Sequence, residues 1–500
     1  MKESLSGETD IRPGPHSLQS ILRATAVLGG SSLITIAVGL VSAKAWALLL
    51  GPDGFGFMGL LVSTVGLMAL LTGTGIHAAL VRLGAAALAE GEMLRLAALR
   101  KATWLLFFVL GGLGTVALVA LRDPVGRWVL GDSERGWAVA LVSVALLFIL
   151  AASVQTNILN THHKVGALAR ISIFSSLLGT ALSIGIVWRW RENGVPFAVC
   201  ASAAAAWAVS YVMLKRTLEP VRVKPAHEDV RAAASSLVRF AGPFAASALV
   251  GSGVQLAVPV LVLHSLGEES VGFYRAAVTI SVAYLGFLLS AMAIDYYPRV
   301  SAASDRPAAL AQLVNQQHQV VMMLGVPMIL ALLALAPYLI PLVYSSEFRP
   351  TVGVLEWQLI GDLLRFSSWT MSYVILVHGG IGLYFMTELA SGVTTIVASV
   401  VGVLLFGLTG FGVAFAVTYA VYYAIAWTLV RRRIGLVWSR RNKTLLVGAL
   451  LAAVLLRALP LAGLGELKLP VGLLCAFGAG AFSLYLIRRD AGGLRGLLAR

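Results

Sequence analysis

Apolar runs dominate the chain. They recur from Leu28 to Leu486 with only short polar breaks between them. A helix needs about 20 apolar residues to cross a hydrocarbon layer about 30 Å thick, which is the length of a typical run here. The pattern predicts an all-α, polytopic membrane protein with about 14 transmembrane helices. We expect these spans at residues 28–50, 56–80, 102–121, 137–158, 168–188, 195–214, 240–264, 271–297, 319–344, 354–378, 382–406, 410–430, 444–462 and 469–487.

Composition supports this class of fold. The chain is 58% hydrophobic and 12% charged, with a mean hydropathy of +0.87. Its longest polar intervals, 1–23, 82–101 and 215–236, are each too short to bury a core of their own. Any chemistry must therefore take place within the membrane or at its surface. Cys200 and Cys475 lie inside apolar runs and form no metal or redox motif.

The charge distribution predicts an orientation. The 38 Lys and Arg residues exceed the 23 Asp and Glu residues, giving a net charge of +15. If alternate segments are assigned to opposite sides, 27 cations lie on the side of the two termini, 8 lie on the other side, and Lys44, Arg275 and Arg365 lie within spans. Basic segments are retained in the cytoplasm, so both termini should be cytoplasmic. Basic stripes interleaved with aromatics are absent, which argues against a nucleic-acid partner.

A weak internal repeat divides the chain. At a spacing of 216 residues, 50–57 (LGPDGFGF) lies over 266–273 (LGEESVGF), and each segment joins a first helix to a second. Such repeats are typical of secondary transporters, which bind cargo between repeated halves. We expect a cytoplasmic N-terminal segment, a six-helix lobe, a cytoplasmic linker, a second six-helix lobe, a basic cytoplasmic loop, two further helices and a cytoplasmic tail. Their bounds are 1–27, 28–214, 215–239, 240–430, 431–443, 444–487 and 488–500.

Three short motifs carry a family resemblance. Residues 49–56 (LLGPDGFG) are followed by 79–82 (ALVR), and the second half contains 271–277 (VGFYRAA) with 297–301 (YPRVS). A polar segment ends the fourth span at 155–166 (QTNILNTHHKVG). With the predicted spans, this pattern resembles the Wzx-like polysaccharide repeat-unit flippases of the multidrug/oligosaccharidyl-lipid/polysaccharide exporter superfamily.

The resemblance implies two six-helix lobes around a cavity that opens alternately to each side. Its cargo would be a polyprenyl-diphosphate-linked oligosaccharide for a surface polysaccharide such as O-antigen or exopolysaccharide, and its location the bacterial inner membrane. The implied partners are membrane lipids, a polysaccharide polymerase and chain-length proteins, and we expect a monomer. Residues 444–487 would form a peripheral pair that guides the polyprenyl tail or serves only in packing.

Span cations are the first candidates for a cargo site. A diphosphate carries about two negative charges, and moving it through hydrocarbon without cationic partners would cost many kcal/mol. Arg365 lies near the middle of its span, too deep for its charge to reach the headgroups easily. Lys44 and Arg275 lie nearer the outer span ends, where long side chains can instead extend to the headgroups. We expect all three to bind substrate.

Span carboxylates are candidates for ion coupling. Asp362 is three residues before Arg365 on one helical face, where it either pairs with that cation structurally or exchanges a proton. Glu388 is a lone carboxyl inside a span that either is structural or titrates during transport. Asp295, His77, Glu356 and His378 lie at span ends and are weaker candidates, and the adjacent pair 162–163 (HH) makes a poor metal site.

Several alternatives remain to be weighed. The chain has no GxxxxGK[ST] phosphate loop and no HExxH motif, and its outer acidic segments are tiny, so we expect no enzyme, cofactor or metal. A cation-coupled multidrug exporter of the same superfamily would favour an anionic cavity, whereas the deep cation Arg365 favours an anionic cargo. A non-transporting membrane scaffold for glycan enzymes is the other alternative.

Overall fold

The computed structural model describes residues 15–219 and 223–490, with side chains except at 15–29, 74, 242–249, 284–295, 487 and 490. All regular structure in these ranges is helical, as the sequence predicted. The α-helices are α1 (Pro15–Ala89), α2 (Met93–Ala120), α3 (Arg122–Val129), α4 (Gly136–Thr161), α5 (Val165–Trp190), α6 (Val195–Thr217), α7 (His227–Leu266), α8 (Glu268–Ala302), α9 (Pro307–Val343), α10 (Thr351–Phe406), α11 (Thr409–Ile434), α12 (Arg440–Ala458) and α13 (Lys468–Asp490). Short 3₁₀ turns, η1 to η5, lie at Ser133–Arg135, Arg191–Gly194, Ser346–Phe348, Leu459–Ala462 and Gly465–Leu467.

Several of these helices are long enough to cross a membrane. In the part of the chain that the structure describes, 9 helical stretches meet length and hydropathy criteria for spans. Some contain two crossings: α1 bends at Gly51 (φ 66°) and α10 at Gly380 (φ 78°). Dividing α1 and α10 there, and leaving the short α3 aside, gives about 14 crossings, which agrees with the prediction. Glycine is suited to both bends because it adopts positive φ without steric cost.

The helix ends differ from the predicted spans. α2 begins at Met93 and α7 at His227, inside intervals that the sequence marked as polar. Helices extend beyond the hydrocarbon because their polar side chains then face headgroups and water, which an apolar-run criterion does not detect. The short helix α3 was also not predicted.

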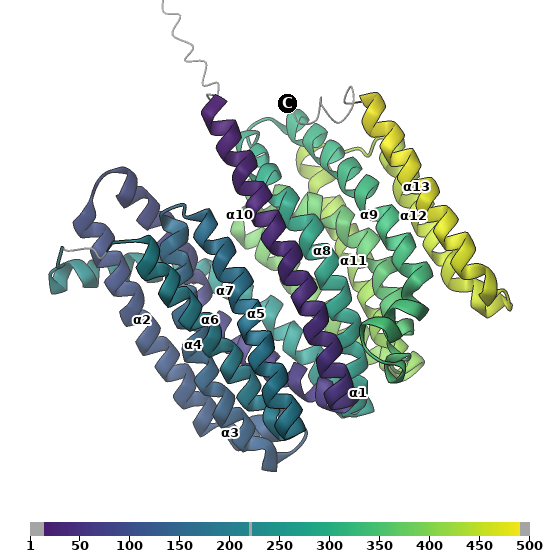
Figure 1. Ribbon diagram of the computed structural model, residues 1–500. Helices are drawn as coiled ribbons and strands as arrows, with labels where there is room; N and C mark the ends of the chain where they lie inside the picture. The colour runs from purple at the N-terminus through teal and green to yellow at the C-terminus, as the bar shows by residue number, and fades with distance from the viewer. Residues whose placement is uncertain (1–14, 220–222, 491–500) are drawn as a thin grey trace, which may run out of the picture.

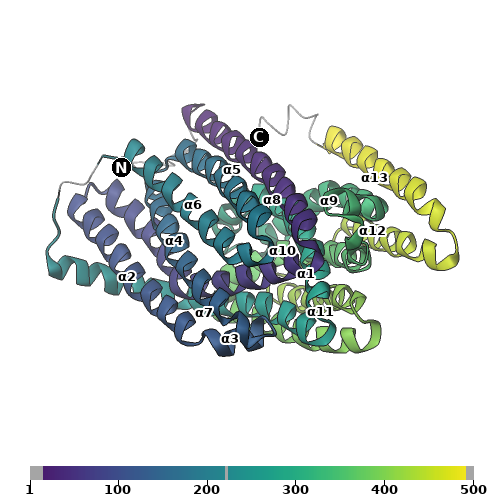
Figure 2. The ribbon, with the colours of Figure 1, turned by 60° about the horizontal axis from the view of Figure 1, so that its bottom comes forward.

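The helices form two groups with α1 between them. Figure 1 shows α2, α4, α5 and α6 on one side of the bundle and α8, α9 and α11 on the other, and Figure 2 shows the same grouping. The first part of α1 runs obliquely across the seam, and α1 packs against α5, α7 and α8. α7 packs against α1 and α2 as well as α8 and α10, so it bridges the groups. We call α1–α6 the first half and α7–α11 the second half.

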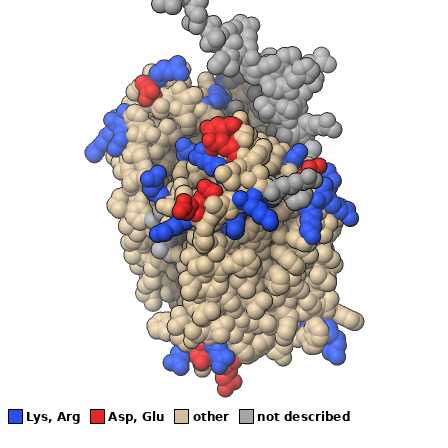
Figure 3. Space-filling view, turned by 90° about the vertical axis from the view of Figure 1, so that its left-hand side faces the viewer, with Lys and Arg blue, Asp and Glu red and all other residues tan. Residues whose placement is uncertain are grey.

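The two ends of the bundle carry the charges. We call the end with Gly51 and Gly267 the junction side, and the opposite end, with segment 215–239, the linker side. Figure 3 shows a broad uncharged band between them, with more Lys and Arg on its upper, linker side than below. This distribution is what a membrane protein requires, because charged side chains avoid the hydrocarbon layer.

The pair α12–α13 flanks the second half at the edge of the bundle (Figure 1). α13 packs along α9, where a Cβ on Gly472 would lie 2.5 Å from the Ala334 Cβ. On the linker side, the Asn442 Nδ2 donates to the carbonyl oxygen of Asn315 (2.9 Å). The pair is thus attached to α9 along its length.

Candidate functional site

The two copies of the repeated segment contact each other on the junction side. Gly51 and Gly267 occupy equivalent positions and both have positive φ, 66° and 88°. Five residues further along each copy, Gly56 and Gly272 lie against the opposite junction. A Cβ there would approach a backbone carbonyl oxygen of the other copy to 2.6 Å at Gly56 and 2.0 Å at Gly272. Both glycines are therefore needed for the two halves to meet this closely.

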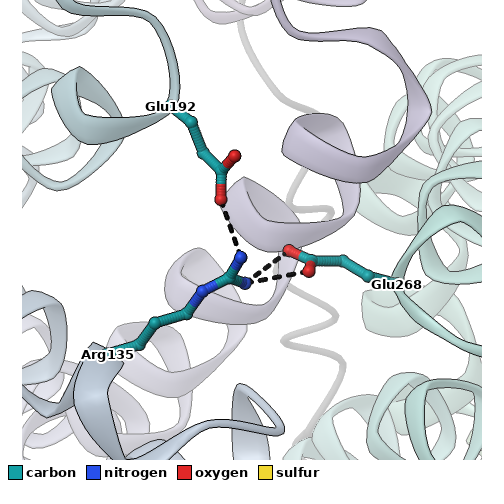
Figure 4. Close-up of polar contacts among 3 residues, drawn as sticks. All are labelled: Arg135, Glu192 and Glu268. Carbon is teal, nitrogen blue, oxygen red and sulfur yellow. Dashed lines mark hydrogen bonds and ion pairs between the residues drawn. The ribbon is translucent and has the colours of Figure 1, made fainter.

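An ion network lies beside these junctions (Figure 4). The Arg135 guanidinium, in η1, donates to both carboxylate oxygens of Glu268 on α8 (2.7 and 2.9 Å) and to Glu192 in η2 (2.9 Å). It also covers the Phe57 ring at 4.7 Å. Burial disfavours the charged guanidinium, but the carboxylates outweigh burial and raise the pKa of Arg135 above its ordinary value. Arg135 therefore stays charged and links the first half to α8.

Lys44 and Arg275 also join the two halves. The Lys44 Nζ donates to the carbonyl oxygens of Pro341 (3.3 Å) and Tyr344 at the C-terminal end of α9, where helix carbonyls lack helical partners. The Arg275 Nη1 on α8 donates to the Ser63 Oγ on α1 (3.0 Å). Neither cation pairs with a carboxylate in the part of the chain that the structure describes. We call the contacts of Arg135, Lys44 and Arg275 across the halves the junction seal.

Arg365 and Asp362 lie together inside the second half. The Arg365 Nη1 is 3.7 Å from the Asp362 Oδ1, and the Asp362 side chain is fully buried whereas that of Arg365 is 31% exposed. The Ser281 hydroxyl on α8 donates to the other carboxylate oxygen (2.9 Å), and the Arg365 guanidinium covers the Tyr419 ring on α11 at 5.3 Å. Three helices therefore hold one partly accessible cation beside a buried carboxylate.

The candidate cations lie at successive depths. Arg365 is 14 residues after the start of α10, about 21 Å along an axis that runs about 43 Å from Thr351 to the bend at Gly380, so it lies near the middle of this crossing. Its partner Asp362 bonds to Ser281, and Arg275 precedes Ser281 by six residues, about 9 Å nearer the junction side. In depth, Arg275 therefore lies between Arg365 and the junction side.

Glu388 also lies in the second half, on α10 beyond the bend at Gly380. It is half-buried on α10 and accepts a hydrogen bond from the Tyr422 hydroxyl on α11 (3.0 Å). The Tyr422 ring contacts the Tyr419 ring at 6.4 Å, and the Arg365 guanidinium covers Tyr419, so two tyrosines of α11 lie between Glu388 and Arg365. The roles of both candidate carboxylates remain predictions.

The weaker candidates do not join this site. His77 packs near Leu150 in the first half, and the His378 Nδ1 is 3.2 Å from the Ser304 carbonyl oxygen on the linker side. The side chain of Asp295 lies outside the described residues. Within the described ranges no three His, Cys, Asp or Glu side chains gather where they could hold a metal ion.

Several contacts between distant residues could not be predicted from the sequence. Arg135 was only one of the eight cations counted on the side opposite the termini, because its partner Glu268 is 133 residues away. Glu356 was considered alone at a helix end, but the Arg457 Nε lies 2.7 Å from one carboxylate oxygen and the Lys468 Nζ bonds to the other. The second copy of the repeat has Glu268 and Glu269 where the first copy has Pro52 and Asp53. This difference in charge was the one sign in the sequence that Glu268 could need a cationic partner.

Weakening the junction seal should open the junction side. Replacing Arg135 by Gln removes the charge that holds Glu268, so a cysteine introduced at Ser63 should become accessible from that side. We expect labelling by a membrane-impermeant thiol reagent to rise severalfold in a protein whose two native cysteines are replaced by alanine. Arg122→Gln, which alters an exposed cation on the same side, is the matched control. Equal labelling of the two variants would contradict this role of Arg135.

Comparison with known proteins places these features in a family. A family profile described as polysaccharide biosynthesis protein matches residues 46–353. The chain is 22% identical over 381 residues to the lipid III flippase of Escherichia coli (strain K12), covering 74% of this chain and 88% of that protein. The lipid III flippase of Shigella flexneri gives the same values.

Solved structures share the fold. The lipid II flippase MurJ in an inward closed conformation superposes with a TM-score of 0.70 at 13% identity, covering 94% of this chain and 99% of that chain. A multidrug resistance MATE family transporter of the MOP superfamily, inward-facing, gives a TM-score of 0.63 at 16% identity, covering 81% of this chain and 94% of that chain. At these identities the likeness concerns the fold alone.

Proposed function

The chain belongs to the polysaccharide biosynthesis protein family, and from this premise we propose that it is a flippase for a polyprenyl-diphosphate-linked oligosaccharide. It moves this cargo from the cytoplasmic to the external leaflet of the bacterial inner membrane, for the assembly of a surface polysaccharide. The similarity to lipid III flippases supports the class of cargo, because those proteins are named for a lipid-linked substrate.

One observation carries the proposal. Arg365 is a partly exposed cation near the middle of the membrane, held beside buried Asp362 on a helix that faces α8. An intramembrane cation is costly and is retained where it serves an anion. The planar guanidinium can also donate two parallel hydrogen bonds to two oxygens of one phosphate. Arg365 is therefore the proposed ligand of the cargo diphosphate.

Lys44 and Arg275 are the proposed second set of ligands. They hold the junction side shut through neutral partners, backbone carbonyls and a hydroxyl, that an anion can replace. When the halves separate, both cations become available to a diphosphate leaving Arg365. Residues 28–214 and 240–430 are the two lobes that we propose separate in this way. Asp362 and Glu388 are the proposed sites of ion coupling.

A multidrug exporter, an enzyme or a scaffold would not require a cation near the middle of the membrane. A multidrug exporter would share the fold, as the MATE structure does, but a cationic drug would be repelled by Arg365. The relatives are transporters and no soluble catalytic domain is present in the described ranges, so we propose no catalysis. A scaffold for glycan enzymes would need no midplane cation.

The function can be tested by deletion of the gene. We expect lipid-linked glycan to accumulate with its sugars facing the cytoplasm, and surface polysaccharide to be lost. A multidrug exporter would instead give drug sensitivity with normal glycan, and a scaffold would lower glycan synthesis without accumulation. Normal export in the deleted strain would refute the proposal.

The proposed direction requires the linker side to be cytoplasmic. Reporter fusions after Arg216 and after Arg433 should therefore indicate the cytoplasm, whereas a fusion at Glu268 should indicate the external side. The excess of cations on the linker side is the physical reason. An external signal from either basic segment would reverse the topology.

A further inference from the structure

Four aromatic side chains gather on the linker side of Arg365. Trp369 and Tyr373 on α10 make an edge contact at 5.1 Å, and Tyr297 on α8 lies 5.7 Å from Tyr373. Tyr296 stacks behind them, 6.1 Å from Trp369, and its hydroxyl donates to the carbonyl oxygen of Thr370 (2.7 Å). Two helices from one half thus assemble a continuous aromatic surface.

The cluster has a buried side and an open side. Tyr296 is 1% exposed and belongs to the core, whereas Tyr297 is 44% exposed and Trp369 and Tyr373 are half-buried. In the part of the chain that the structure describes, the hydroxyls of Tyr297 and Tyr373 have no hydrogen-bond partner. Trp369 and Tyr373 pack against the same core as Tyr296 with part of each side chain, and the rest of each ring stays accessible beside Tyr297.

The open rings lie at a defined distance from the proposed phosphate ligand. Trp369 follows Arg365 by four residues, so it lies on the same helical face about 6 Å along the axis. Tyr373 follows by another four residues, about 6 Å further. The first sugar of a diphosphate-linked glycan is joined directly to the phosphate. A subsite for that sugar must therefore begin next to the cation that binds the phosphate, at a distance of about the width of one sugar ring.

We propose that Trp369, Tyr373 and Tyr297 form a sugar-stacking subsite for the glycan of the cargo, an inference that rests on the proposed function. The C–H face of a sugar ring carries partial positive charge and packs by dispersion on the negative face of an aromatic ring. The sugar hydroxyls can then bond to the two tyrosine hydroxyls. A polyprenyl chain can also pack its C–H groups on the rings but has no hydroxyl groups, so only the glycan can make both kinds of contact.

A binding measurement tests this subsite. The full chain in lipid nanodiscs is titrated with two probes: lipid-linked oligosaccharide purified from the cells that express the protein, and the same polyprenyl diphosphate without sugar. Tyr373→Leu and Tyr297→Leu each remove one ring but keep an apolar side chain, and we expect each to weaken binding of the glycan probe about tenfold, the scale of one aromatic contact. Binding of the sugar-free probe should be unchanged, and Tyr373→Phe should keep most of the affinity. Tyr338→Leu, at a 60% exposed tyrosine on α9, is the matched control.

The outcomes separate the two proposals. If wild-type protein binds neither probe, the proposed function fails and the subsite with it. If it binds both probes and the leucine variants weaken both equally, the rings serve packing or the lipid, and the subsite is wrong. If the variants change neither affinity, the subsite is also wrong. Only a loss confined to the glycan probe, at normal folding of the variant, supports it.

Discussion

Replacing Arg365 by Ala should lower glycan export at least about 100-fold, the scale of losing one partner of a buried charge pair, while the protein still inserts into the membrane. The diphosphate would then cross the middle of the bilayer without its cation, and an unpaired anion there costs many kcal/mol. Export is measured as the accumulation of lipid-linked glycan in cells, and membrane abundance by immunoblot. Arg349→Ala, at an exposed arginine on the junction side, is the control and should export normally.

The charge and the shape of Arg365 can be separated. Arg365→Lys keeps a cation but loses the planar donor fork and its contact with the Tyr419 ring, so it should retain part of the export. Arg365→Gln keeps polar atoms without charge and should behave like Ala. Equal export by the Lys and Gln variants would show that the charge of Arg365 is not what binds the cargo.

Asp362 distinguishes a cargo site from a structural ion pair. If the diphosphate takes the guanidinium, the Asp362 carboxylate loses its cation and gains a proton more readily, which couples cargo binding to proton uptake. Asp362→Asn should then transport with an altered pH dependence. In a purely structural pair, each single change would lower the amount of folded protein and the double change Asp362→Asn with Arg365→Gln would restore it. Full export by a normally abundant double variant would eliminate the site.

The sequence predicts those parts of the fold that depend on local pattern. Apolar runs specify the crossings because each run must satisfy the same layer thickness. Gly51 and Gly267 bend both junctions with positive φ, and the repeat found at 50–57 and 266–273 explains why they occupy equivalent positions. The family resemblance drawn from these segments is confirmed. The spacing of Asp362 and Arg365 likewise gives their contact, because residues three apart meet on a helix.

Contacts between distant segments could not be predicted in the same way. Lys44 on α1 bonds to carbonyl oxygens at the end of α9, and nothing in the sequence of α1 indicates that α9 is its neighbour. Arg135 and Glu268 meet only because the two halves close on the junction side. A single sequence carries no signal for such pairs, since any loop cation could have met any loop carboxylate.

The second large effect concerns Glu356, which lies between two cations that come from α12 and α13. The Glu356 and Lys468 side chains are 5% and 6% exposed and that of Arg457 is 21% exposed, so the carboxylate neutralises charge that water scarcely reaches. Glu356→Gln leaves both cations without it, and we expect a loss of about 3–5 kcal/mol in the free energy of unfolding. Thermal unfolding of purified protein measures this loss. Glu466→Gln, at an exposed carboxylate in the turn between α12 and α13, should leave the unfolding midpoint unchanged. An unchanged midpoint in Glu356→Gln would show that the contacts of Glu356 with Arg457 and Lys468 do not stabilise the protein.

The contacts of Glu356 with Arg457 and Lys468 also determine how the role of α12 and α13 must be tested. Removing the residues after Lys443 deletes both cations and leaves the buried Glu356 carboxylate without a partner from α12 or α13. This truncation alone should therefore be unstable, whatever role α12 and α13 have in cargo transport. Truncation combined with Glu356→Gln removes the stranded charge and restores folding in part. If the pair guides the polyprenyl tail, this folded truncation should still fail to export glycan. Full export by the combined variant would show that α12 and α13 serve packing alone.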